Sequence, residues 1–186
     1  MGEILSYLAA VLPADVSAGA RLLALQCALR MNAYMHVELA AGLLHGLRID
    51  AGETCDELER ARWLRVVNGP GAAGVSAELL DATLLAQSPA RPDRRRAADW
   101  ALRTGCPARI GETEPRLRLP GVYLGAHSDP SSGEGQSEWD RIIRDCGLHD
   151  QGFHGALTRL TVNGVLEGWR ICPDSGDVHW MLAPGQ

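Results

Sequence analysis

The side chains best suited to chemistry in this sequence are arginines gathered between residues 91 and 118. That segment holds eight arginines and four acidic residues, whereas the segments before and after it have net charges of −4 and −5. Arg94, Arg95 and Arg96 are consecutive and fall in the predicted first turn of a helix, where positive charge opposes the helix dipole. A phosphate-bearing partner would relieve this repulsion. The alternative is an ordinary solvated helix end in a chain whose 18 basic residues are all arginine.

A second set of polar side chains could read the edges of DNA bases. They lie on the predicted outward face of a helix over residues 150–163 and on the hairpin that follows it. Glutamine and arginine can make paired hydrogen bonds to bases, while neighbouring groups hold phosphates. Double-stranded DNA is therefore the first predicted partner. The set consists of Asp150, Gln151, His154, Thr158 and Arg159 on the helix, with Arg170 on the hairpin.

Other reactive residues form weaker constellations. The cysteines and histidines that come closest in the sequence are Cys146, His149, His154, Cys172 and His179. No pair has zinc-finger spacing, and Cys146 falls on an apolar helix face, so we predict a core cysteine and no metal. A hydrolase arrangement around His127 lacks a nucleophile elbow and a glycine-rich oxyanion loop. We expect no enzymatic activity and no cofactor.

Length and composition bound the class of protein. With 186 residues, 46% of them hydrophobic, the chain can bury a core as one large domain or two small ones. The five cysteines form an odd, scattered set, which is not a disulfide framework. The N-terminus lacks the features of a signal peptide, and no apolar run approaches the ~20 residues that span a bilayer. We expect a soluble, cytoplasmic protein without membrane contact.

The elements that must position these residues are clearest between residues 136 and 182. Apolar residues recur at helical spacing from Trp139 to Cys146, and Gly147 then ends that helix. The second predicted helix covers 150–163. Alternating apolar residues on either side of a Pro-Asp-Ser-Gly-Asp turn predict a β-hairpin over 165–182.

The order helix, sharp turn, helix, strand, turn, strand resembles the winged helix-turn-helix. The resemblance is carried by the pattern ALxRLxxxGxLxxWR followed by SGDxxWxL, between Ala156 and Leu182. Together with the preceding helix it covers about a quarter of the chain. Proteins of this family bind DNA, RNA or other proteins, so the resemblance implies a fold and leaves the function open. It implies that helix 150–163 would be the helix that enters the major groove.

The segment before residue 75 repeats this order in outline and predicts a second winged helix. Its three helices are expected over 17–32, 35–45 and 50–64. A plain helical bundle is the alternative, because three amphipathic helices do not specify winged-helix packing. Glu53, Asp56 and Glu57 lie on the outward face of the third helix and would repel phosphate. We expect this helix to face solvent, a second subunit or another protein.

These observations predict a mainly α fold with small β-hairpins, arranged as a tandem winged helix-turn-helix. The predicted parts are an N-terminal domain over 1–75, a connecting helix and linker over 76–92, and a C-terminal domain over 93–186. The C-terminal domain is expected to begin with the helix after residue 93. A loop insertion at about 106–135 should follow, extended over 117–127.

The expected function is a DNA-binding transcriptional regulator that forms a homodimer. Arg94, Arg95, Arg96 and Arg170 would contact phosphates while helix 150–163 reads bases. The alternative is a non-enzymatic scaffold of tandem winged helices, similar to subunits of chromosome-organising complexes. It would bind a protein partner through the acidic N-terminal domain, and the net charge of −5 favours it.

Overall fold

The protein is a mixed α/β structure with two small sheets. The computed structural model describes residues 1–104 and 114–184. Of these residues 52% are helical and 21% lie in strands. The strands form two three-stranded antiparallel sheets. The predicted fold class, mainly α with only small hairpins, is therefore wrong. It missed β1 (His36–Ala40) and β3 (Gly74–Leu79) in the N-terminal half and β4 (Glu134–Glu138) in the C-terminal half.

The N-terminal half consists of six elements, of which three are the strands of its sheet. They are α2 (Ala18–Arg30), β1, α3 (Ala41–Leu47), α4 (Ala51–Arg60), β2 (Leu64–Gly71) and β3 (Gly74–Leu79). The central strand is β3, which pairs with both β1 and β2. Ser17 caps α2 by accepting a hydrogen bond from the backbone N–H of Ala20 at 3.2 Å.

Two predictions for this half are wrong. The helix expected over 35–45 is a strand in its first part, because Val37 and Leu39 are buried at a spacing of two and pair with β3. The helix expected to begin at residue 76 is also a strand there, since β3 continues to Leu79. Only the short α5 (Thr83–Gln87) follows it. In both segments the spacing of the apolar residues is compatible with a helix and with a strand. Pairing with distant strands determines that a strand forms.

The C-terminal half repeats the order of elements. They are α7 (Pro115–Ala126), β4, α8 (Trp139–Cys146), α9 (Asp150–Val162), β5 (Leu166–Ile171) and β6 (Asp177–Leu182). Here β6 is the central strand, between β4 and β5, just as β3 is central in the other sheet. The two helices and the hairpin predicted between residues 136 and 182 are confirmed.

Helix α7 lies where the sequence predicts an extended segment in a loop insertion over 106–135. The prediction was an extended segment over 117–127, yet these residues are helical as far as Ala126, and Pro120 lies inside α7. Every residue from Leu117 to Leu124 is buried, and this packing outweighs the local propensity. Residues 106–113 of the predicted insertion lie outside the described residues.

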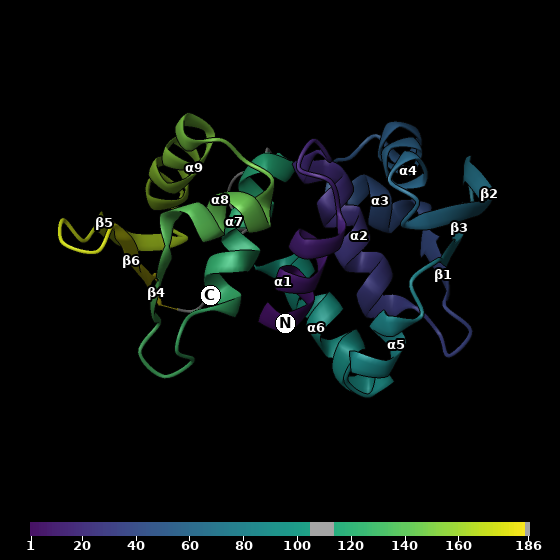
Figure 1. The fold of residues 1–186 in the computed structure, drawn as a ribbon, viewed down its shortest axis with the longest axis horizontal. Helices are drawn as coiled ribbons and strands as arrows, with labels where there is room; N and C mark the ends of the chain where they lie inside the picture. The colour runs from purple at the N-terminus through teal and green to yellow at the C-terminus, as the bar shows by residue number, and fades with distance from the viewer. Residues whose placement is uncertain (105–113, 185–186) are drawn as a thin grey trace.

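Two helices join the halves. In Figure 1, α1 (Gly2–Val11) lies at the centre of the molecule, and it packs against α2, α7 and α8. Helix α6 (Arg91–Arg103), the predicted first helix of the C-terminal domain, packs against α2 instead. The first helix of the C-terminal half is α7, which precedes β4 as α2 precedes β1. Helix α7 also contacts α2. The buried apolar side chains form one continuous cluster from Ile4 to Trp180. Within the described ranges, no helix combines the length and apolar character needed to cross a membrane.

Candidate nucleic-acid interface

The outer face of α9 is the candidate interface. Phe153, Leu157 and Leu160 are fully buried and hold the helix on the core. The residues predicted to read bases all lie on the opposite side and are exposed: Gln151, His154, Thr158 and Arg159. Gly155 lies between them, and a Cβ added there would meet no described atom within 4 Å. The middle of this face therefore has no side chain, and longer polar side chains border it.

The turn between α8 and α9 fixes the direction in which α9 leaves the core. Gly147 has φ +60°, in the left-handed region. A Cβ at this position would lie 2.4 Å from Nε of the buried Arg21. His149 then caps α9, because its Nδ1 accepts a hydrogen bond from the backbone N–H of Gly152 at 3.0 Å. The sequence identified Gly147 as a helix stop, but its contact with Arg21 is visible only in the structure.

Aromatic side chains connect α9 to its neighbours on both sides. At its start, Trp139 Nε1 donates a hydrogen bond to Asp150 Oδ1 at 2.9 Å, and the ring of Trp139 meets that of Phe153 edge-on. Near its middle, the ring of His154 meets Trp169 of β5 edge-on, with centroids 5.1 Å apart. Helix α9 is thus held against both α8 and the hairpin, which favours a preorganised surface.

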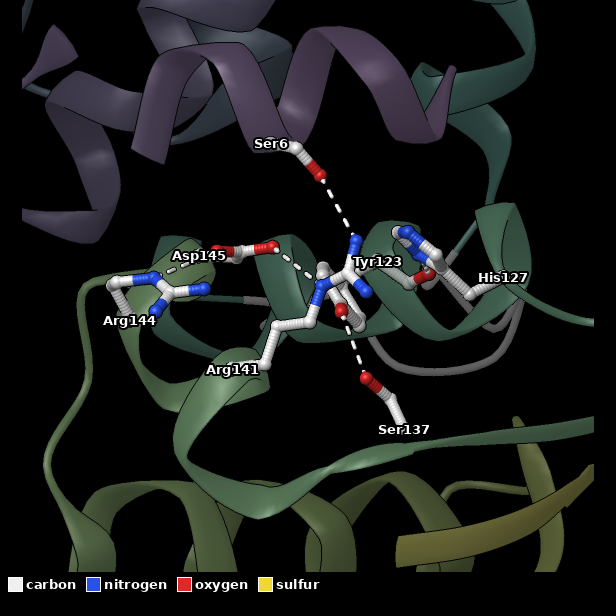
Figure 2. Close-up of polar contacts among 7 residues, drawn as sticks. All are labelled: Ser6, Tyr123, His127, Ser137, Arg141, Arg144 and Asp145. Atoms are coloured by element: carbon white, nitrogen blue, oxygen red, sulfur yellow. Dashed lines mark hydrogen bonds and ion pairs between the residues drawn. The ribbon is translucent and has the colours of Figure 1, made fainter. Parts of the chain in front are cut away.

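A buried carboxylate organises the arginines of α8. Asp145 is 4% exposed, and its Oδ1 and Oδ2 lie 3.5 Å and 3.9 Å from Nε of Arg144 and Arg141 (Figure 2). Burial raises the pKa of Asp145, although the two guanidinium groups act in the opposite direction. Arg141 also donates a hydrogen bond to Ser6 Oγ at 3.5 Å and so links α8 to α1. Both arginine side chains remain about half exposed or more, at 47% and 66%.

Figure 2 also shows how α7 is tied to the sheet. Tyr123 Oη and Ser137 Oγ of β4 lie 3.3 Å apart, and the Tyr123 ring stacks on His127 one turn later. His127 Nδ1 lies 2.9 Å from the Tyr123 carbonyl oxygen. Burial raises the pKa of Tyr123. These contacts position α7 and β4 as the support behind α8.

Sequence reasoning missed Arg141 and Arg144 as candidate phosphate contacts. They stand three residues apart on the polar side of a helix whose apolar side was identified correctly, and that spacing is the signal that could have found them. The predicted hairpin residue, Arg170, is exposed on β5 and pairs across the sheet with His179. Arg159 lies 3.6 Å from Glu114, which offsets part of its charge.

The predicted arginine cluster does not join this surface. Arg94 is 5% exposed and donates hydrogen bonds to the carbonyl oxygens of Pro89 and Met31, both at 2.9 Å. It fastens α6 to the end of α2 and is inaccessible to a phosphate. Arg95 and Arg96 are exposed, and Arg96 pairs with Asp93. In Figure 1, α6 lies at the bottom of the molecule and α9 at the top left. The cluster and α9 are therefore separate surfaces.

The corresponding helix of the N-terminal half is acidic on its outer side. Glu53, Asp56 and Glu59 of α4 are exposed. Glu57, predicted to point outward, instead accepts hydrogen bonds from the backbone N–H and the hydroxyl of Ser17, at 2.8 and 3.0 Å. It holds α4 against the start of α2. Phosphate would be repelled by the remaining carboxylates.

The part of the chain that the structure describes contains no group of three His, Cys, Asp or Glu residues placed to hold a metal ion. Cys146 is fully buried, which confirms the core position predicted for it, and burial raises the pKa of its thiol. Comparison with protein-family models, curated proteins and solved structures finds no match to this chain. Any function must therefore be argued from the surfaces themselves.

Proposed function

We propose that this protein binds double-stranded DNA through α9 and acts as a transcriptional regulator of the winged helix-turn-helix type. One observation carries the proposal: α9 is the second helix of a tightly fixed pair and exposes polar side chains suited to base edges. On its outer face, among the described residues, Asp150 at the first position is the one exposed carboxylate. Asp150 already accepts the hydrogen bond from Trp139.

The dimensions of α9 support this role. A helix of 13 residues is roughly 20 Å long and, with its side chains, narrow enough for the ~12 Å major groove. Gln151 and Arg159 can each make paired hydrogen bonds to a base. Val162, 81% exposed at the end of the helix, suits contact with a thymine methyl group. Arg141, Arg144 and Arg170 are the candidate phosphate contacts.

The charge distribution predicts weak but measurable salt dependence. With three arginines near phosphates, the logarithm of the binding constant should fall with the logarithm of salt concentration at a slope of about −2.7. The net charge of −5 opposes binding at long range, so affinity should depend on these local contacts.

Fluorescence anisotropy with pooled duplexes of mixed sequence, titrated over a salt series, tests the proposal. We expect Arg159→Ala to weaken binding by about tenfold, as loss of a charged hydrogen-bond donor does. Arg95→Ala removes the same charge from α6, away from α9, and should change binding less than twofold. Absence of binding at low salt, or equal losses in the two variants, would overturn α9 as the reading helix.

A scaffold function is the second candidate, and the exposed carboxylates of α4 favour it. Glu53, Asp56 and Glu59 would repel DNA and complement a basic protein surface. In this role the N-terminal half would bind a protein or a second copy of the chain. Sedimentation of the purified protein measures self-association directly. A monomer that binds duplex DNA would exclude the homodimer and retain the regulator.

A further inference from the structure

A polar hollow lies on the N-terminal half, far from α9. It has a volume of about 320 Å³ and is formed by the first turns of α6, the end of α2, and strands β1 and β3. Three arginines line it, Arg30 from α2 and Arg91 and Arg95 from α6. Its other lining groups are polar as well, so its chemistry differs from that of an apolar ligand pocket.

The walls of this hollow are held in place by specific hydrogen bonds. Buried Arg94 fixes the start of α6 to the end of α2 through its bond to the Met31 carbonyl oxygen. Arg30 is oriented by Gln26 Oε1 at 3.0 Å and Asp99 Oδ1 at 2.8 Å. The relative positions of the arginine-bearing elements are therefore set before any ligand binds.

The loop from α2 to β1 is equally defined. Asn32 Oδ1 accepts hydrogen bonds from the backbone N–H groups of Tyr34 and His36, at 2.8 and 3.1 Å. Met35 adopts φ +62°, an uncommon value for a residue with a side chain. This arrangement turns the amide of Asn32 and the ring of His36 toward the same hollow, since both line it.

The positive charge in the hollow is poorly neutralised. Arg91 and Arg95 are exposed, stand one helical turn apart and take part in no ion pair within residues 1–104 and 114–184. Like charges at this spacing repel each other, and both also oppose the helix dipole. Burial, and then the charge of Arg91, lower the pKa of Arg94. Among the described lining residues, Glu38 is the one carboxylate.

We propose that this hollow binds a small phosphate monoester that carries hydroxyl groups, such as a sugar phosphate or a nucleoside monophosphate. Guanidinium groups bind phosphate oxygens through paired hydrogen bonds, which Arg91 and Arg95 can supply together. Glu38 accepts hydrogen bonds and would hold a ligand hydroxyl opposite the phosphate. The hollow is concave. The helix α6, which carries Arg91 and Arg95, lies away from α9 in Figure 1, and both facts favour a compact ligand over a DNA backbone.

Isothermal titration calorimetry at low ionic strength tests this site. The probes are glucose 6-phosphate and AMP, with glucose and adenosine as their uncharged counterparts and sulfate as a plain anion. We expect saturable binding of a phosphorylated probe, weaker binding of sulfate and none of the uncharged compounds. Arg91→Ala and Arg95→Ala should each weaken binding at least about tenfold, as loss of a charged hydrogen-bond donor does.

The matched control is Arg96→Ala, which removes the same charge from the adjacent position outside the hollow and should change binding less than twofold. Glu38→Gln should tighten binding of sulfate, which has no hydroxyl for Glu38 to hold, by removing the repulsion between the carboxylate and the anion. Equal losses in Arg95→Ala and Arg96→Ala, or no saturable binding of either phosphorylated probe, would overturn the site. A loss of duplex DNA binding in Arg95→Ala would assign the hollow to DNA instead. The site involves no residue of α9, so the result of this test does not depend on whether α9 binds DNA.

Discussion

Replacing Gly147 by alanine should destabilise the protein more than the same change at any open left-handed glycine of its C-terminal half. Gly147 and Gly164 both have positive φ, at +60° and +71°. Placing an alanine in this conformation costs roughly 1–2 kcal/mol. At Gly164 a new Cβ meets no described atom within 4 Å, so this cost stands alone. Comparing Gly147→Ala with Gly164→Ala therefore separates the cost of backbone strain from the cost of steric conflict.

At Gly147 the new Cβ would lie 2.4 Å from Nε and 2.7 Å from Cδ of Arg21. Arg21 is 3% exposed and donates hydrogen bonds to the carbonyl oxygens of Val16 and Pro13, at 3.1 and 2.8 Å. Moving this side chain weakens one or both bonds, which adds about 2–3 kcal/mol because the donor is charged and buried. The expected total for Gly147→Ala is roughly 3–5 kcal/mol.

Urea denaturation followed by tryptophan fluorescence measures this difference, since the chain has five tryptophans. Gly155→Ala, on the open face of α9, serves as the opposite control and should stabilise the protein by about 0.5–1 kcal/mol through helix propensity. If Gly147→Ala and Gly164→Ala lose the same free energy of unfolding, Arg21 is not rigid and the α8–α9 turn is not fixed in the way described.

Three further predictions concern the supports of the two surfaces. Phe153→Ala, which empties a fully buried site beneath α9, should lower the free energy of unfolding by about 3–5 kcal/mol in urea denaturation. Arg94→Ala should destabilise by about 2–4 kcal/mol through its two lost backbone contacts, while exposed Arg95→Ala stays within about 0.5 kcal/mol, as thermal melts would show. Burial raises the pKa of Asp145 above its ordinary 3.8, so the folded state binds this proton more tightly than the unfolded state. Its contribution to stability should decline as pH rises from 3.8 through the raised pKa, and Asp145→Asn should remove that slope from a pH series of denaturation curves.

The C-terminal elements were predictable because their signals are local. In α8, apolar side chains recur at helical spacing and a glycine follows at once, and both facts can be read without knowing any distant contact. The hairpin of β5 and β6 likewise has its turn residues within five positions. The polar side of α9 followed from the same periodicity.

The strands β1 and β4 depend on partners far along the chain. Val37 pairs with Ala77 and Ser137 with Val178, about forty residues away in each case. Five-residue segments of this kind have no local signal strong enough to outweigh a neighbouring helix pattern. Helix α7, predicted as an extended segment, also depends on packing, because burial of every residue from Leu117 to Leu124 stabilises the helix around Pro120.

The role of Arg94 also depends on contacts that are distant in the sequence. Three consecutive arginines form one charged cluster in the sequence, but the helix distributes them over different sides. Arg94 points inward to backbone carbonyl groups, Arg95 lines the hollow and Arg96 pairs with Asp93. Their separate roles follow from how α6 packs on α2, which the composition of the segment does not reveal.

The central position of α1 has a consequence for synthesis on the ribosome. Ile4, Leu5 and Leu8 are buried partly against α8, whose first residue, Trp139, follows the end of α1 by 128 positions. At about 5–20 residues per second, the nascent chain waits roughly 6–26 s before this partner emerges. During that interval the surface of α1 that α8 will cover is open to chaperones and to other nascent chains, although α2 and later α7 can already pack against α1. The packing of α1 is thus completed only after α8 has been synthesised.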